Sequence, residues 1–500
     1  MRSFLLLFFS LITCITHAQK INDPKAFANL ITEDDLKKHL YIIAGKDFEG
    51  RETATEGQRK AAAYIENNFK ALGLEPGNKN SYQLFYPVYQ DSLVDMNIMI
   101  NNQSFQPYED FDANMSANYS CTLLSNEIVF ANYGISDPDY DDYKGLDVKG
   151  KIVLVRSSEP VERLQEEIKK GTFNAFAKQD AAQQHGAIAL LVIQESLPTE
   201  KIDSKGIMYL DGYKKSIRLN TFYISEKIGK AIMGDDYLKL ANGDPKPKTY
   251  TANIKLEYTK ATSMLQSSDV LGYLEGSDLK DQLLVISAHY DHLGKKDTVI
   301  YYGADDDGSG TVSLIELAAI FSKAKAAGQG PRRSILFLAN SGEEKGLWGS
   351  EYYIDHPAYP LNQTTADLNI DMIGRIDPNR KHGDSTNYVY VVGDNKLSTD
   401  LHTINESMNK KYTKLELDYK FNDPKDPDRM YYRSDHYNFA RKGVPVIFYF
   451  DGIHNDYHKP TDTPDKINYD IFAKRAKLVF YTAWEMANRD DMIKRDKSLE

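Results

Sequence analysis

From Leu271 onward, the sequence repeats a short apolar run, a polar turn and a helical segment. Such alternation is typical of an α/β domain with a mixed, mostly parallel central sheet that is flanked by helices. The predicted strands are Leu283–Ala288, Ser334–Ala339, Leu368–Asp371, Tyr388–Val392 and Val446–Phe450. The first three lead into polar or acidic residues. In open α/β sheets, ligands bind beyond the carboxyl ends of the strands, so we expect the chemistry at these endings.

A different texture runs from about residue 125 to residue 251, with short β runs separated by frequent glycine, aspartate and tyrosine. Within it, Lys149–Arg156 (KGKIVLVR) predicts a buried strand. Ala175–His185 predicts a helix that ends at Gly186, and Ala187–Ile193 predicts the next strand. Upstream, the predicted elements are an amphipathic helix and two short strands, at Glu56–Leu72, Tyr82–Val88 and Met96–Ile100. We therefore expect a β-rich module, inserted over residues 91–259.

The first twenty residues, MRSFLLLFFSLITCITHAQK, combine a basic Arg2, an apolar run over Phe4–Ile12 and a small-residue ending at Ala18. This pattern predicts a signal peptide over residues 1–18 and an exported protein, periplasmic or extracellular. The apolar run is too short to span about 30 Å of hydrocarbon, which argues against a membrane anchor. Lipid attachment at Cys14 is the other alternative, but Thr13 stands where a lipobox has glycine or alanine.

Charge and cysteine content restrict the classes of partner. Removing residues 1–18 deletes one arginine and no acid, so the formal net charge changes from −11 to −12. This charge disfavours nucleic acid and anionic membranes, and no later segment is long and apolar enough to be a membrane span. Only Cys121 then remains, so an intramolecular disulfide is excluded and stability must come from the core and from metals.

Two acidic or imidazole-bearing segments follow the first predicted strand. In SAHYDHLG, His289 and Asp291 lie two residues apart and face the same side of an extended chain. Imidazole is the commonest zinc ligand, and a carboxylate behind it orients the ring. GADDDGSG, which includes Asp306, concentrates three acids in a glycine-rich turn before a predicted helix. An ordinary strand end and a solvated acidic loop are the alternatives.

Three further segments carry similar side chains. NSGEEKGLWGS supplies the adjacent Glu343 and Glu344, which allow one carboxylate to bind a metal and the other to transfer protons. The alternative is a charged helix start, since acids favour the first turn. NIDMIG places Asp371 at the end of an apolar strand, where a buried carboxylate needs a partner. DYHKPTDT supplies Tyr457 and His458.

These five segments, in this order, resemble the di-zinc aminopeptidase family, whose relatives include glutamate carboxypeptidases, glutaminyl cyclases and the transferrin-receptor ectodomain. The inserted module resembles the protease-associated domain, on KGKIVLVR, the following helix and the stretch Thr221–Ser225. The resemblance implies a discontinuous peptidase domain over 19–90 and 260–490. It also implies a protease-associated core over about 125–251 and a charged tail over 491–500.

The resemblance implies two Zn²⁺ ions per chain and a role for each residue. The terminal ligands would be His289 and Asp371 for one ion, and Glu344 and His458 for the other, with Asp306 bridging and Glu343 as the general base. It also implies a cis peptide after Asp306. Asp291 would lie behind His289.

Tyr457 and Arg433 are expected to contact the substrate. Tyr457 would donate a hydrogen bond to an oxyanion, and Arg433 would hold a substrate carbonyl or carboxylate. An ordinary packing or salt-bridge role is the alternative for both.

The resulting prediction is a secreted zinc aminopeptidase that acts on peptides. A carboxypeptidase or dipeptidase of the same family is the main alternative. A glutaminyl cyclase would use one zinc and a reduced ligand set, and a receptor-like ectodomain would have lost ligands, whereas all five positions are filled here. A calcium-binding protein is disfavoured by His289 and His458, because calcium prefers oxygen ligands. No feature of the sequence indicates an oligomeric state.

Overall fold

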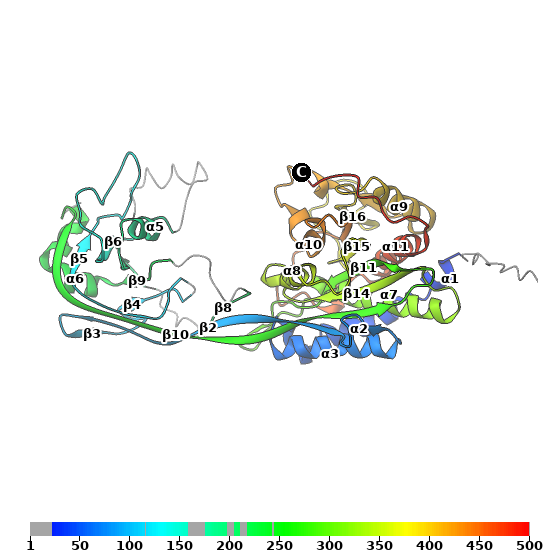
Figure 1. Cartoon of the computed structure of the whole chain (residues 1–500), viewed down its shortest axis with the longest axis horizontal. Helices are drawn as coiled ribbons and strands as arrows, with labels where there is room; N and C mark the ends of the chain where they lie inside the picture. Colours follow the sequence, from blue (N-terminus) through cyan, green and yellow to red (C-terminus); the bar gives the residue numbers. More distant parts are fainter. Residues whose placement is uncertain are drawn as a thin grey trace, which may run out of the picture. The chain divides into compact units, whose positions relative to one another are not determined.

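The computed structural model describes residues 23–115, 117–158, 176–197, 205–210, 218–242 and 245–499 (Figure 1). The predicted signal peptide lies outside these residues. The chain divides into two compact units, one formed by Met1–Tyr86 with Gln266–Glu500 and the other by Pro87–Leu265. The sequence placed the divisions near residues 91 and 259. The structure places them at 87 and 265, within two long strands, β2 (Gln83–Ile100) and β10 (Lys248–Leu274).

The first unit is built around one mixed sheet with strand order β17-β16-β18-β15-β11-β14-β10. The strands are β10, β11 (Leu279–His289), β14 (Arg333–Asn340), β15 (Thr364–Ile370), β16 (Tyr388–Val392), β17 (Glu416–Asp418) and β18 (Val446–Phe450). Neighbours are parallel from β18 through β15 and β11 to β14, and β10 and β16 pair antiparallel with β14 and β18. The predicted mixed, mostly parallel sheet is therefore confirmed.

The helices of this unit cover both faces of the sheet. They are α1 (Lys25–Ala28), α2 (Glu33–Ile43), α3 (Glu56–Ala71), α7 (Gly310–Ala326), α8 (Trp348–Asp355), α9 (Asp400–Met408), α10 (His436–Ala440) and α11 (Tyr469–Asn488). Ile286 of β11 and Phe337 of β14 pack in one core with residues of α2, α3, α7 and α11. The alternate residues Val285 and Leu338 pack in a second core with residues of α8 and α10. Burial on both faces explains why these strands are continuous apolar runs.

In the second unit, the strands are hydrogen-bonded in the order β10-β5-β6-β7-β9-β4. Its elements are β2, β3 (Gln103–Phe105), β4 (Phe111–Asp112), β5 (Cys121–Phe130), β6 (Ile152–Arg156), α5 (Ala177–Gln184), β7 (Ala189–Ile193), β8 (Lys205–Tyr209), β9 (Thr221–Ile224) and α6 (Glu226–Met233). The prediction of two short strands over Tyr82–Ile100 was wrong. One strand spans this region, because its middle, from Tyr89 to Ser92, pairs with β8. The alternation of more and less buried side chains is lost in this middle part, so the sequence did not reveal that the strand continues.

A buried polar contact joins three helices of the first unit. His39 on α2 lies 2.6 Å from the Tyr64 hydroxyl of α3 through Nδ1 and 3.4 Å from Glu316 Oε1 of α7 through Nε2. Glu316 is only 6% exposed. Burial raises the pKa of Glu316 to about 7, with Asp35 adding to the shift.

No helix within the described part of the chain is long and apolar enough to cross a membrane.

We predict that Glu316→Gln stabilises the protein at pH 8 more than at pH 4. Folding raises the pKa of Glu316 from 4.5 to about 7. Below pH 4.5 the buried side chain is therefore neutral and does not lower the free energy of unfolding. Its ionisation destabilises the fold as the pH rises through this range, by at most about 3 kcal/mol above pH 7. Urea denaturation at both pH values measures the difference. Glu56→Gln, on the exposed side of α3, is the control, and an equal effect of Glu316→Gln at both pH values would contradict the prediction.

Candidate metal centre

Three predicted site segments meet because three parallel strands end together. β11 lies between β14 and β15, and its register places His289 opposite Asn340. His289 is the last residue of β11, Asp371 directly follows β15, and Glu343 and Glu344 form a single turn after β14. The carboxyl ends of parallel strands meet at one edge of a sheet. The predicted strand endings therefore lie side by side.

The acidic turn before α7 presents only its middle carboxylate to this edge. Asp305 Oδ1 accepts a hydrogen bond from the backbone N–H of Gly374 at 2.7 Å, and Asp307 Oδ1 accepts one from Met372 at 3.1 Å. The two outer acids thus attach the turn to the segment that follows Asp371. The Asp306–Asp307 peptide is cis, as the resemblance implied.

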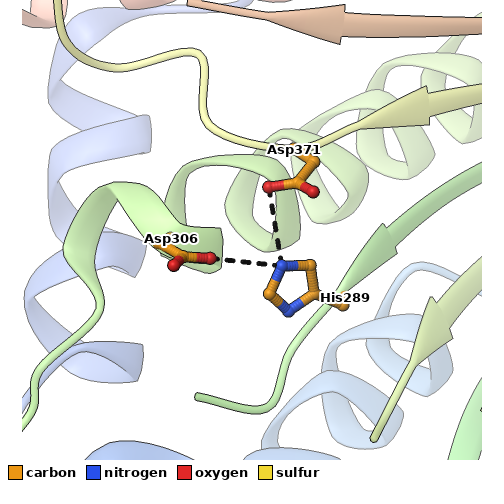
Figure 2. Close-up of side chains that lie close together, drawn as sticks. All are labelled: His289, Asp306 and Asp371. Atoms are coloured by element: carbon orange, nitrogen blue, oxygen red, sulfur yellow. Dashed lines mark ion pairs between the residues drawn. The ribbon is translucent and has the colours of Figure 1, made fainter. Parts of the chain in front are cut away.

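Asp306 stands between two sets of ligand atoms. On one side, His289 Nε2 lies 3.3 Å from Asp306 Oδ1 and 3.5 Å from Asp371 Oδ1 (Figure 2). On the other side, His458 Nε2 lies 3.1 Å from both Asp306 Oδ2 and Glu344 Oε2. The two oxygens of one carboxylate therefore face different imidazoles. This is the arrangement that a bridging carboxylate requires.

His292 is a neighbour that the sequence analysis missed. Its Nδ1 lies 2.8 Å from Glu344 Oε1 and 3.8 Å from Asp306 Oδ2, and the ring is fully buried. The only available signal was its place three residues after His289 in SAHYDHLG. Among the residues that the structure describes, two groups have ligand atoms within 4.8 Å of one another: His289, Asp306 and Asp371, and His292, Asp306 and Glu344.

The side chains present fit a zinc centre. His289 Nε2, Asp306 Oδ2, Glu344 Oε1 and both ring nitrogens of His292 are buried and lack a hydrogen-bond partner. Imidazole nitrogens and carboxylate oxygens in this proportion suit Zn²⁺. A buried polar atom without a partner is costly, and a divalent cation would supply one for each of these atoms.

Protons and metal ions compete for these groups. Burial lowers the pKa of His289, but the carboxylates of Glu343 and Asp371 outweigh it and raise that pKa well above its ordinary value. Burial lowers the pKa of His458, but the neighbouring carboxylates of Asp306 and Glu344 outweigh it and raise that pKa to about 10. Metal binding requires neutral imidazoles, so it must release protons.

A layer of hydrogen bonds holds the ligands from behind. His289 Nδ1 lies 3.1 Å from the backbone oxygen of Asp291 and 3.7 Å from its carboxylate, which directs the other ring nitrogen, Nε2, into the site. The Ser434 hydroxyl donates to Asp371 Oδ2 at 2.7 Å. Asp462 Oδ2 accepts from the backbone N–H of Asp306 at 3.3 Å. Asp462 lies in DYHKPTDT and Ser434 directly follows Arg433, but the sequence did not indicate these contacts.

Tyr457 and Arg433 line a cavity that the candidate ligands Asp306 and Asp371 also line. Arg433 Nη2 lies 3.3 Å from the Tyr457 hydroxyl. The Tyr457 ring stacks on His458 with ring centroids 3.8 Å apart. Three acids and five apolar side chains complete the lining: Asp306, Glu343, Asp371, Met372, Met430, Phe448, Phe450 and Ile453. The cavity lining therefore combines acidic and apolar side chains.

These features define an α/β protein with a candidate two-metal centre at the carboxyl edge of its sheet. Residues 269–483 match peptidase family M28, and residues 115–232 match the PA domain. The chain contains an M28 peptidase domain interrupted by a PA domain. The resemblance predicted from the five motifs is thus confirmed.

Individual relatives show how far the similarity extends. A probable leucine aminopeptidase of Arthroderma otae is 30% identical over 214 residues, which cover 41% of this chain and 55% of the relative. The chain thus spans about half the length of this curated relative. An aminopeptidase from Aneurinibacillus sp. strain AM-1 has a similar structure, with a TM-score of 0.55 and 17% identity over 96% of this chain and 100% of that one. The structure of BSAP, a zinc aminopeptidase from Bacillus subtilis, is similar with a TM-score of 0.52 and 18% identity, over 94% of this chain and 98% of that one.

We predict about two zinc ions per chain, because the donors form two sets around one carboxylate. Asp306→Asn should weaken the binding of both zinc ions, whereas His458→Ala should weaken the binding of one. Metal analysis after dialysis against a weak chelator measures the content. Equal losses in the two variants would contradict the assignment of Asp306 as the shared ligand. A matched control is His402→Ala. His402 is a half-exposed histidine of α9, and its ring pairs with Asp394.

Proposed function

We propose that this protein is a zinc-dependent aminopeptidase that removes N-terminal residues from peptides. The observation that carries the proposal is the position of Asp306, with one oxygen facing His289 and the other facing His458, beside Glu343. The M28 match and the names of the similar proteins support it. His289 and Asp371 would hold one ion, Glu344 and His458 the other, with Asp306 shared.

The zinc ions, when bound, would lower the pKa of a water molecule and stabilise negative charge on the substrate. Glu343 is the proposed general base. Its Oε2 lies 3.9 Å from His289 Nε2, and its carboxylate lines the cavity. Burial raises the pKa of Glu343 well above its ordinary value, and Asp371 and Glu344 add to the shift. A carboxyl group of raised pKa suits a residue that takes a proton from water and delivers it to the departing nitrogen.

The other cavity residues suggest how a substrate would be held. The Tyr457 hydroxyl would donate a hydrogen bond to the developing oxyanion. Arg433, its neighbour, would bind a substrate carbonyl. An unprotonated or carboxylate-steered α-amino group would lie near the metal centre, beside Asp371.

The apolar residues of the cavity lining favour an apolar N-terminal residue. Met430, Phe448 and Phe450 line the cavity and are each at most 3% exposed, so they form a packed apolar wall. Burying an aliphatic side chain there would contribute about 1.5–3 kcal/mol. Leucine, isoleucine and phenylalanine are the proposed preferred residues.

Carboxypeptidase or dipeptidase action is the second candidate, because Arg433 lines the same cavity and could bind a substrate carboxylate. The two activities differ in which substrate end must be free. Leucyl peptides with a blocked carboxyl end test the first, and peptides with a blocked amino end test the second. We expect hydrolysis only when the amino end is free; cleavage that instead requires a free carboxylate would contradict the aminopeptidase assignment.

We further propose that the protein is exported, with residues 1–18 removed. The basic start, short apolar run and small-residue ending support this. N-terminal sequencing of the mature protein is the measurement, and the expected first residue is Gln19.

Glu343→Gln should lower kcat by about 10²–10⁴-fold, because the amide cannot accept a proton. The side chain keeps its size, so zinc content should not change. Steady-state kinetics on leucyl chromogenic substrates, with metal analysis of the same samples, measure both. Glu351→Gln on α8, outside the cavity lining, is the control. Retained turnover would contradict the role assigned to Glu343.

Ile453→Ala should reduce kcat/KM for leucyl substrates by about tenfold relative to alanyl substrates, because the enlarged cavity loses contacts with the longer side chain. Ile354→Ala is the matched control. Ile354 belongs to the same apolar core but not to the cavity lining. Its substitution should lower the melting temperature and leave the substrate ratio unchanged. An unchanged ratio in Ile453→Ala would remove this residue from the specificity site.

A further inference from the structure

Four consecutive residues near the N-terminus, Gly50–Thr53, contact the loops that carry the candidate metal ligands. We call them the clamp segment. Three of these loops are involved: loop A (residues 290–294, after β11), loop B (residues 301–309, before α7) and loop C (residues 341–346, after β14). The sequence analysis assigned no role to the clamp segment.

Gly50 allows the clamp segment to approach two loops at the level of their backbones. Its φ of +71° is in the left-handed region, and a Cβ atom here would lie 2.3 Å from the Gly294 oxygen and 2.4 Å from the Tyr301 oxygen. The backbone oxygen of Gly50 also accepts from Gly294 N–H at 3.0 Å. Only glycine fits between loops A and B at this point.

Arg51 joins loops A and B through its guanidinium group, which is fully buried. Nε donates to the Tyr290 oxygen of loop A at 2.7 Å, and Nη1 and Nη2 donate to the Tyr302 and Gly303 oxygens of loop B at 2.8 and 2.9 Å. Nη1 also donates to the Ile43 oxygen at the end of α2. One rigid, planar cation therefore sets the spacing of two loops.

Glu52 and Thr53 connect the clamp segment to loop C. Glu52 Oε1 lies 2.7 Å from Lys345 Nζ. The Thr53 hydroxyl donates to Asp291 Oδ2 at 2.7 Å, and the other oxygen of that carboxylate accepts from the backbone N–H of Glu343 at 3.2 Å. Through Asp291, Thr53 influences both His289 and the Glu343–Glu344 turn.

We propose that the clamp segment is a positioning element that sets the relative places of the three loops and thereby the zinc affinity of the centre. This inference rests on the proposed metal centre. Each loop follows a different element, so sheet register alone does not define their spacing to the precision that metal ligands need. Groups that hold metal ligands from behind change metal affinity by about 10–100-fold when they are replaced.

The test compares Arg51→Met with Arg333→Met in the mature full-length protein. Arg333 is also fully buried and donates to backbone oxygens, those of Met486 and Asp490 among them, but it starts β14 at the opposite end of the sheet. Zinc affinity is measured by competition with a chromogenic chelator, and the melting temperature is measured on metal-free samples. Both variants should melt at lower temperature. Only Arg51→Met should bind zinc more weakly, by about 10–100-fold.

A second pair of variants keeps the test decisive if Arg51→Met does not fold. Thr53→Val removes the hydroxyl and keeps the shape, so zinc affinity should fall by about tenfold. Thr53→Ser keeps the hydroxyl and should restore the wild-type affinity. Wild-type affinity in Thr53→Val, or in a folded Arg51→Met, would overturn the proposal.

The affinity measurements separate this proposal from the proposed function. A wild-type protein that binds zinc but cleaves no peptide would overturn the aminopeptidase assignment, while the variants would still test the clamp segment. A wild-type protein that binds no zinc would overturn the metal centre and the clamp proposal together.

Discussion

Buried negative charge at the carboxyl edge of the sheet is the constraint on which the first unit depends. Asp291, Asp305, Asp306, Asp307 and Asp462 are each at most 3% exposed. A buried carboxylate without a partner is expensive, so each must find a donor or a cation. Four of them take backbone N–H groups of neighbouring loops, and those hydrogen bonds shape the loops. Asp306 is different, because its oxygens face imidazoles.

This division of labour shows how a site built from loops is held together. The carboxylates that do not face the cavity attach one loop to the next: Asp307 joins the acidic turn to the segment after β15, and Asp291 joins loops A and C. The guanidinium of Arg51 adds a cationic counterpart. Burial lowers the pKa of Arg51 to about 10, with Asp291 and Asp306 opposing the shift, so the group is positively charged at neutral pH. Acids and one cation together organise the backbone around the candidate ligands.

The comparisons separate what is shared from what this chain specifies. The structural similarity extends over 96% of the chain at only 17% identity, which indicates that the arrangement of elements is shared while most side chains differ. The apolar residues of the cavity lining, with Met430 from a 3-10 turn, Ile453 from a loop and Phe448 and Phe450 from β18, are where such differences would change the preferred substrate. The similarity to these structures therefore concerns the fold, whereas selectivity would depend on the cavity lining of this chain.

The sequence by itself determined five strands of the first unit's sheet, their order along the chain and the candidate ligands at the ends of the first three. Local pattern was sufficient there, because a strand buried on both faces must be an apolar run, and a charged residue directly after it must lie at the sheet edge. Only the tertiary structure decided what depends on distant contacts. The continuity of β2 comes from pairing with β8, and the site of His292 comes from the approach of Glu344. The place of Arg51 comes from carbonyl groups about 240 to 250 residues further along the chain, at Tyr290, Tyr302 and Gly303. A buried arginine has no periodicity to reveal it, since its partners are backbone oxygens, which every residue carries.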